Sequence, residues 1–257
     1  MSGGAGNFGS GSVGSNASKP GYEVINKFGE NLDIDQAETP IEIWSHGSGG
    51  PRFPFLDTGI AMDIVSTSAD DSLAGIGSQK AIVTYYTTDN TKVELDVDLA
   101  GLTRVPIGDD VKFVSRVFLY QSGSNMSNVG EVNAVDRATG LVVYQSVEIG
   151  LSQTGSALQI CEKGKTGIVK RTKVGYAKGQ NPLGSADMRF NVRKANGTIV
   201  TKHSVLISSI KPSDTEEPPV GNVAELEEGD IAYWLCQSVS ADNTPIEARF
   251  DMEVFDA

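Results

Sequence analysis

The sequence predicts an all-β protein, an antiparallel two-sheet sandwich of jelly-roll type with an irregular extended N-terminal arm. Three observations predict it. Beyond residue 57 the chain consists of short runs rich in Val, Ile, Thr, Tyr and Phe, separated by Gly, Asn and Asp. Residues 92–99 and 249–254 alternate between apolar and polar side chains, which gives a strand one buried and one solvated face. Stretches with helical periodicity are scarce.

The first 57 residues divide into a tail and an arm. Residues 1–20 are dominated by Gly, Ser and Asn, and such a stretch cannot bury enough apolar surface to offset its ordering entropy, so we expect a flexible tail. Residues 21–57 carry scattered large apolar residues among Gly, Pro and acids, and neither the strand nor the helix period fits for long. We therefore expect an extended interaction arm that packs on a neighbouring subunit.

Residues 58–257 are predicted to form one β-sandwich domain. Turn chemistry at Asp89–Asn90, at Thr139–Gly140 and above all at Asn196–Gly197 favours antiparallel neighbours. About a dozen strands suit two packed sheets, and a jelly roll is the arrangement we expect, with other two-sheet topologies left open. The predicted strands are residues 60–67, 80–88, 92–99, 112–120, 131–136, 141–147, 157–162, 167–176, 188–192, 199–207, 230–237 and 246–255.

Composition argues against several classes of partner. The chain has 21 Lys and Arg against 33 Asp and Glu, a net charge of -12, and such a surface repels nucleic acid and anionic lipid. No run approaches the roughly 20 apolar residues of a membrane helix, and the N-terminus lacks the features of a signal peptide, so we expect synthesis in the cytoplasm. Cys161 and Cys236 lie in apolar runs and are expected to be buried and reduced.

The candidate motifs for catalysis or cofactor binding lack the flanking elements or the spacing that their function requires. Residues 9–14 match the Gly-x-Gly-x-x-Gly fingerprint, but no strand precedes them and no helix follows. The only histidines are His46 and His203, which leaves few bases for a nucleophilic site. Acid pairs such as Asp70–Asp71 could bind a hard cation, yet none has EF-hand spacing. We expect a non-enzymatic protein without cofactor, metal or catalytic residues.

Large apolar residues of the arm are the candidate partner-binding residues. Trp234 lies in a run that reads as a core strand, whereas Trp44 has no local core and is expected to anchor an interface. If the arm serves only binding, a chain cut before Pro54 should keep its sandwich and lose its partner. The predicted interface residues are Phe28, Ile34, Ile43, Trp44, Phe53 and Phe55.

Several segments resemble a widespread group of virion structural proteins of tailed bacteriophages. Residues 28–35 read Phe-Gly-Glu-Asn-Leu-Asp-Ile-Asp, and residues 40–44 read Pro-Ile-Glu-Ile-Trp. The resemblance continues through residues 65–71, 75–77, 122–124, 128–132 and 162–166, and so covers most of residues 28–176. It departs at Glu30, at Leu32 and at Ser45–His46, where Arg, Pro and Asp-Gly would be expected.

The resemblance implies a capsid-stabilising or decoration (cement) protein of the virion. Its partner would be the major capsid protein, and it would form a homo-oligomer, plausibly a trimer, on the outer surface of the capsid. Two alternatives stay open. The chain could be a tail, neck or receptor-binding component that binds a host surface or glycan, or it could be a free carbohydrate-binding module.

Overall fold

The computed structural model describes residues 21–46, 51–177, 184–208 and 222–257. Within these ranges the protein is all-β and antiparallel, with one short 3-10 turn, η1 (Gln36–Glu38). The predicted tail and the Gly-x-Gly-x-x-Gly match lie outside the described residues. The strands are β1 (Tyr22–Ile34), β2 (Ile41–Glu42), β3 (Ile60–Ser66), β4 (Ser78–Tyr86), β5 (Lys92–Asp98), β6 (Val105–Val111), β7 (Phe113–Ser122), β8 (Val132–Asp136), β9 (Val143–Val147), β10 (Leu158–Ile160), β11 (Lys165–Tyr176), β12 (Ser185–Arg193), β13 (Ile199–Ser208), β14 (Ala224–Leu226), β15 (Ile231–Val239) and β16 (Thr244–Asp256).

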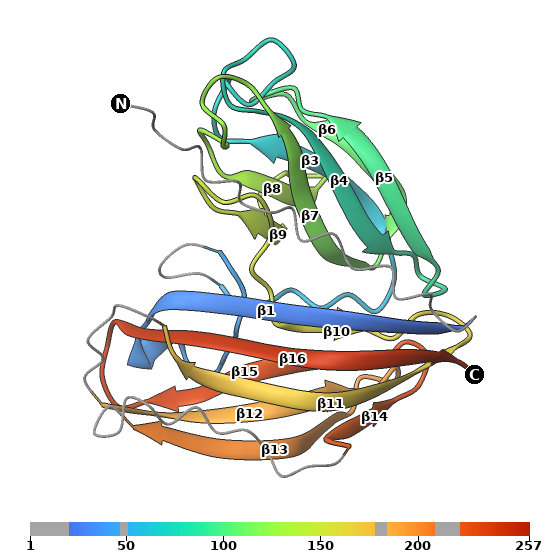
Figure 1. Ribbon diagram of the computed structural model, residues 1–257, viewed down its shortest axis with the longest axis vertical. Helices are drawn as coiled ribbons and strands as arrows, with labels where there is room; N and C mark the ends of the chain where they lie inside the picture. The colour runs from blue at the N-terminus through green and yellow to red at the C-terminus, as the bar shows by residue number, and fades with distance from the viewer. Residues whose placement is uncertain (1–20, 47–50, 178–183, 209–221) are drawn as a thin grey trace, which may run out of the picture.

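Two sheets form the first lobe, the lower one in Figure 1. One sheet has the order β1-β16-β11-β14 and the other the order β10-β15-β12-β13, with β2 also pairing on β15. Both sheets contribute to one apolar core. At its centre the Phe190 ring lies 5.3 Å from that of Phe250 and 5.4 Å from that of Trp234. The predicted burial of Trp234 in a core strand is confirmed.

In the first lobe the first strand in the chain pairs with the last, and the remaining strands pair in the same nested way. In chain order β1 pairs with β16, β10 with β15, β11 with β14 and β12 with β13, each antiparallel. The two sheets arise when these nested pairs fold over one another, which brings β16 beside β11 and β15 beside β12. Most pairings therefore join segments far apart in the sequence.

Strands β3 to β9 form a second lobe, the upper one in Figure 1. Its sheets have the orders β6-β3-β8-β9 and β5-β4-β7, and they share a second apolar core. A third cluster, which includes Trp44, Phe53, Phe113 and Tyr233, joins residues of the two lobes. The two lobes therefore have separate cores and an apolar junction.

The second lobe is inserted between β2 and β10, two short strands that together occupy the place of a single strand beside β15. Strand β2 pairs with residues 235–236 of β15 and β10 with residues 231–233, so both lie along the same edge. Between them the chain leaves at Trp44 and returns at Ser156, which form a β-bridge. The Ser45 amide also donates to the Gly155 carbonyl at 2.6 Å. These outgoing and returning segments form a two-stranded neck, as expected where an insertion has adjacent ends.

The expectation of an irregular arm is wrong for residues 22–34, because they form the 13-residue strand β1 paired with β16. Neither face of β1 is uniformly apolar. Val24 and Phe28 are exposed on one face, while Lys27 and Gly29 on the other lie against the second lobe and the neck. The alternation that identifies a half-buried strand is therefore missing. Since β1 completes a sheet, removal of the residues before Pro54 is not expected to leave the first lobe intact.

Beyond residue 57 the predicted strands coincide with strands of the structure, although they belong to two lobes rather than one sandwich. The predicted turns have the positive φ expected of them, at Asn90 (61°), Gly140 (72°) and Gly197 (85°). Sequence reasoning missed β6 and β14. Strand β6 contains Pro106 and Gly108, which are depleted in strands, and β14 has only 3 residues.

Gly29 fixes β1 against the neck. A Cβ at this position would lie 2.4 Å from the Ala157 nitrogen and 2.7 Å from the Ile43 oxygen, both backbone atoms that cannot rotate away. We expect Gly29→Ala to lower the free energy of unfolding by about 2 kcal/mol through overpacking. Chemical denaturation measures this, with Asn26→Ala on the exposed part of the same strand as control. Equal stability of the two variants would contradict the close approach.

Among the described residues no helix is long and apolar enough to cross a membrane.

Candidate functional site: interaction surfaces on the two lobes

The structure separates the predicted interface residues into buried and exposed ones. Ile34 and Ile43 lie in the core of the first lobe, and Trp44 and Phe53 lie in the junction between the lobes. All four have at most 5% of their surface exposed and are not accessible to a partner in this fold. From the sequence these residues were expected at an interface, because no core lies near them in the chain. The strands that bury them are distant in sequence. Their burial corrects that expectation.

Two of the predicted interface residues remain outside the cores. Phe55 is partly buried against the junction, with its ring 5.2 Å from that of Tyr233 and the Arg193 guanidinium 5.5 Å from its centroid. Phe28 is 48% exposed on β1 and is the one predicted anchor that a partner could reach directly.

A chain of polar contacts crosses the junction between the lobes. Lys27 of β1 donates to the Ser115 carbonyl of β7 at 2.7 Å. The Ser115 hydroxyl donates to Gln159 of β10 at 2.8 Å, and the Gln159 amide donates to the Tyr86 hydroxyl of β4 at 2.9 Å. Burial, and secondarily the nearby Arg116, lower the pKa of Lys27 to about 7. The junction therefore contains an ammonium group that is hydrogen bonded but has no carboxylate partner among the described residues.

We expect this lysine to make stability depend on pH. Its folded-state pKa lies below the unfolded value, so between about pH 7 and pH 10 the unfolded chain binds more protons and the free energy of unfolding rises with pH. Lys27→Met should remove that rise. Denaturation of both proteins at pH 6, 7, 8 and 9 measures the difference, and parallel pH profiles would show that Lys27 does not titrate in the junction.

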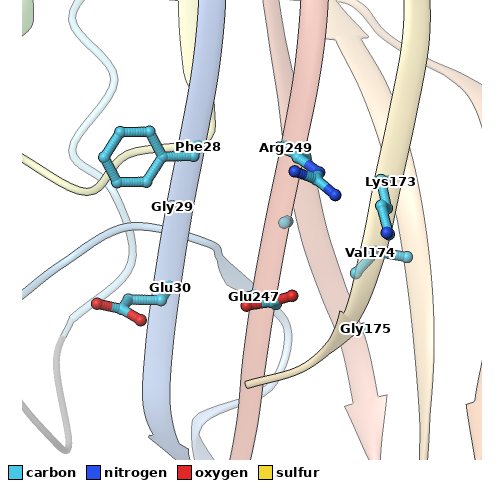
Figure 2. Close-up of a pocket in the computed structure, with 9 residues that line it drawn as sticks. Phe28, Gly29, Glu30, Lys173, Val174, Gly175, Glu247 and Arg249 are labelled. Carbon is cyan, nitrogen blue, oxygen red and sulfur yellow. The ribbon is translucent and has the colours of Figure 1, made fainter. Parts of the chain in front are cut away.

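The first candidate surface is the outer face of the first lobe, meaning the side of β1, β16 and β11 turned away from the core. Figure 2 shows Phe28, Arg249 and Lys173 in one row across the three strands, and Glu30 and Glu247 in the next row. These side chains surround a shallow depression of about 160 Å³. Its floor and rim are lined by Phe28, Gly29, Glu30, Lys173, Val174, Gly175, Glu247, Ala248 and Arg249.

The second candidate surface is formed by the distal loops, residues 67–77, 100–103 and 123–130. Figure 1 places the β3–β4 and β7–β8 connections at the end of the second lobe away from the first. The buried Asp71 carboxylate ties these loops together. It accepts hydrogen bonds from the amides of Ser78 (2.8 Å), Val129 (2.9 Å) and Gly130 (2.8 Å) and from the Ser66 hydroxyl (2.6 Å).

Glycines allow the close approach of backbone around Asp71. A Cβ at Gly77 would lie 2.1 Å from the Asp71 carboxylate oxygen, and a Cβ at Gly130 would lie 2.5 Å from the Ser68 nitrogen. The segments at residues 65–71, 75–77 and 128–132, which carry the sequence resemblance, therefore meet at one place. Their residue types are explained by this hydrogen-bonded core of the loops.

The distal loops also expose large apolar side chains. Leu73 and Ile76 are each 51% exposed, Leu102 is 63% exposed and Met126 is 86% exposed. Backbone hydrogen bonds join their loops, from the Asn125 amide to Ile76 at 2.8 Å and from the Gly101 amide to Asp71 at 2.8 Å. Because several apolar side chains are held in water on hydrogen-bonded loops at one end of the lobe, these loops are a candidate protein-binding surface. Apart from the motifs themselves, no feature of the sequence predicts this surface.

A cleft of about 340 Å³ lies between the lobes beside the neck. It is lined by Glu30, Asn31, Leu32, His46, Glu131, Glu148 and Ile149. Burial, followed by the charges of Glu30 and Glu131, raises the pKa of Glu148, while burial lowers the pKa of His46. No group of three or more His, Cys, Asp or Glu that could hold a metal ion occurs in the described part of the chain.

Both cysteines are buried and unpaired, as expected, and burial raises the pKa of each thiol to about 12. The two histidines lie in different places. His46 stacks on Trp44 at the neck with ring centroids 4.9 Å apart, whereas His203 lies on β13 with its ring 6.3 Å from Trp234.

Comparisons with known proteins do not assign this chain to a family. No protein-family model matches the chain, and no curated protein matches it. A solved structure of the Gt strain of infectious bursal disease virus shares 9% identity over 91% of this chain and 72% of its own, with a TM-score of 0.21. The VP2 subviral particle of the same virus shares 10% identity over 92% of this chain and 72% of its own, also with a TM-score of 0.21. The solved structures to which the chain is weakly similar are thus those of a virus and its VP2 particle, and TM-scores this low carry no argument about its function.

Proposed function

We propose that the protein is a non-enzymatic structural component of a bacteriophage virion, which decorates the capsid and stabilises it by bridging subunits of the major capsid protein. What supports this proposal is the exposure of apolar side chains at two separate candidate surfaces, one on each lobe. A bridging protein needs at least two such surfaces. The outer face of the first lobe presents Phe28, and the distal loops present Leu73, Ile76, Leu102 and Met126.

The proposal includes a jelly roll for the first lobe. Its eight main strands pair first with last in two four-stranded sheets, which is the nesting that folding one long antiparallel hairpin into two Greek keys produces. Jelly rolls occur in capsid, lectin and cupin domains, so the fold alone does not select a function. The inserted second lobe would then project from this base and carry the distal loops.

The sequence resemblance supports the choice of partner. Three of the segments that carry the resemblance to tailed-bacteriophage virion proteins, residues 65–71, 75–77 and 128–132, converge on Asp71 and the distal loops, which are a candidate contact surface. The acidic composition also favours a position away from packaged DNA, on the outer surface of the shell. A homo-oligomer would multiply the contacts of each surface with the shell.

A co-sedimentation experiment tests the proposal. Purified chain is mixed with shells assembled from the major capsid protein without it, and bound chain is measured against concentration. We expect saturable binding that Ile76→Ser combined with Met126→Ser weakens at least tenfold. Ile199→Ser, at a residue of similar exposure (53%) on β13, is the matched control and should bind normally.

Three outcomes would count against the proposal. Failure of the wild-type chain to bind shells would remove the capsid role. Binding to cells or immobilised glycans instead would favour the alternative of a tail, neck or receptor-binding component. Binding that the distal variant leaves unchanged would reject the distal loops as the contact surface.

A further inference from the structure

The outer face of the first lobe carries an unusual arrangement of charge. Lys173 of β11 and Arg249 of β16 are direct cross-strand neighbours, and both are basic. Two residues further along, Glu247 of β16 and Glu30 of β1 are direct cross-strand neighbours, and both are acidic. A positive row therefore lies beside a negative row, separated by Ala248 on the central strand.

This arrangement is unfavourable within a single chain. Like charges directly opposite one another destabilise an antiparallel pair, and exchanging Arg249 with Glu247 would have placed opposite charges in both rows. Elsewhere in the described part of the chain charged side chains do form ion pairs, such as Lys80 with Asp98 and Lys170 with Glu253 on neighbouring strands. Lys173, Arg249, Glu30 and Glu247 take part in none of the ion pairs among the described residues.

The two charges on the central strand, Arg249 and Glu247, are however complementary to those of a second copy. When a second face is laid on the first with a two-fold axis across the strands over Ala248, the two copies of β16 face each other in opposite directions, while Lys173 faces Gly175 and Glu30 faces Phe28. Arg249 of one copy then lies against Glu247 of its partner, and the contact occurs twice. This is the self-complementarity that an isologous interface requires.

We propose that the outer face of the first lobe is the contact between two copies of this chain, related by a two-fold axis that passes over Ala248. The inference does not require the proposed function, because a virion protein, a receptor-binding protein or a free module could each pair in this way. If the chain also binds shells, this face is taken up by the second copy, and the dimer would bridge subunits through its two sets of distal loops. It replaces the general expectation of a homo-oligomer with a defined surface and symmetry.

The shape of the face favours a second copy over a small ligand. The depression of about 160 Å³ is smaller than the 300–1,000 Å³ of typical ligand pockets. Three strands about 5 Å apart and roughly 10 residues long present a flat face of roughly 500 Å². Exposed apolar side chains of β1, namely Val24, Phe28 and Leu32, border the charged rows and can be covered in the same contact.

The size of the face also sets the expected strength. A stable complex usually buries about 800 Å² on each partner, so a face of this size predicts weak association, with a dissociation constant on the order of 10 μM. The contribution of the ion pairs should fall with salt, because they lie near the surface.

Charge reversal on the central strand gives a sharp test. Sedimentation velocity of the full chain over a range of concentrations measures the monomer–dimer equilibrium for wild type, Arg249→Glu, Glu247→Arg and the double exchange of the two. We expect each single variant to raise the dissociation constant at least tenfold, since like charges then meet twice. The double exchange restores complementarity and should return the constant to within threefold of wild type.

Folding gives an opposite readout that separates this role from a structural one. Arg249→Glu places an acid opposite Lys173, and Glu247→Arg places a base opposite Glu30, so both variants improve the cross-strand pairs of the single chain. Their monomers should unfold at the wild-type temperature or above while dimerisation is lost. Lys202→Glu, exposed on β13, changes the net charge as Arg249→Glu does and should leave dimerisation unchanged.

Four results would overturn the inference. A wild-type chain that stays monomeric at 100 μM would reject the contact, and a trimer without a dimer would reject the two-fold axis. Dimerisation that the single variants leave unchanged, or that the double exchange fails to restore, would reject this face. None of these results depends on whether the chain binds capsid shells.

Discussion

Replacing Asp71 by alanine is expected to lower the free energy of unfolding by about 4 kcal/mol. The carboxylate is fully buried and accepts hydrogen bonds from three backbone amides and one hydroxyl. Each buried donor left without a partner costs about 1–3 kcal/mol, and alanine removes all the acceptors at once. Ser78, Val129 and Gly130 would each retain an amide that water cannot easily reach.

The effect should be local to the distal loops before it is global. Hydrogen exchange monitored by mass spectrometry should show loss of protection at residues 78 and 128–131, together with a lower denaturation midpoint. Asp70→Ala is the matched control, because Asp70 is exposed and next in sequence, and it should change stability by less than about 0.5 kcal/mol. Equal effects of the two variants would show that Asp71 does not tie the loops together.

Trp44→Ala is expected to cost about 4 kcal/mol of unfolding free energy, because a buried aromatic ring is replaced by a cavity. Trp44 is 1% exposed, its ring lies 5.2 Å from that of Phe53, and it bridges to Ser156 at the neck. The cavity would open between the lobes. Thermal unfolding of the purified variant measures the loss.

Phe28→Ala is the natural comparison for Trp44→Ala. Both residues were predicted from the sequence to be interface anchors, but Phe28 is 48% exposed. Its truncation should cost less than about 1 kcal/mol of stability and should weaken self-association. A Trp44→Ala protein as stable as wild type would contradict the burial of Trp44 and restore the original expectation of an anchor.

The contrast between these residues shows where sequence reasoning was sufficient. The strands beyond residue 57 and the turns at Asn90, Gly140 and Gly197 were found because alternation and turn chemistry are local signals. Trp234 was placed correctly because it lies in a continuous apolar run. That run is buried on both faces, against the core of the first lobe on one side and the junction on the other.

Strand β1 was missed because its environment is set by partners distant in sequence. It pairs with the last strand, β16, and Lys27 contacts Ser115 of the inserted lobe. No local pattern distinguishes such a strand from an irregular arm. The same non-local pairing hid the insertion itself, since the two halves of one strand position, β2 and β10, are separated by the whole second lobe.

The candidate surfaces were predictable only in part. Phe28 was predicted as one of six interface residues, but the charge rows beside it appear only once the register of β1, β16 and β11 is known. Asp71 was noted from the sequence only as part of Asp70–Asp71, one of several acid pairs. Its role depends on amides from residues 78, 129 and 130, and the glycines at 77 and 130 were the one local hint that backbone approaches closely there.

The most direct test of the proposed function is the copy number and position of this chain in purified virus particles, measured by quantitative mass spectrometry and cryo-electron microscopy. We expect copies on the order of hundreds, arranged on the outer shell with the capsid symmetry and with the distal loops against major capsid protein. A few copies at a vertex or tail would assign the chain to joining or attachment. Absence of the chain from the particles would contradict a role in the virion altogether.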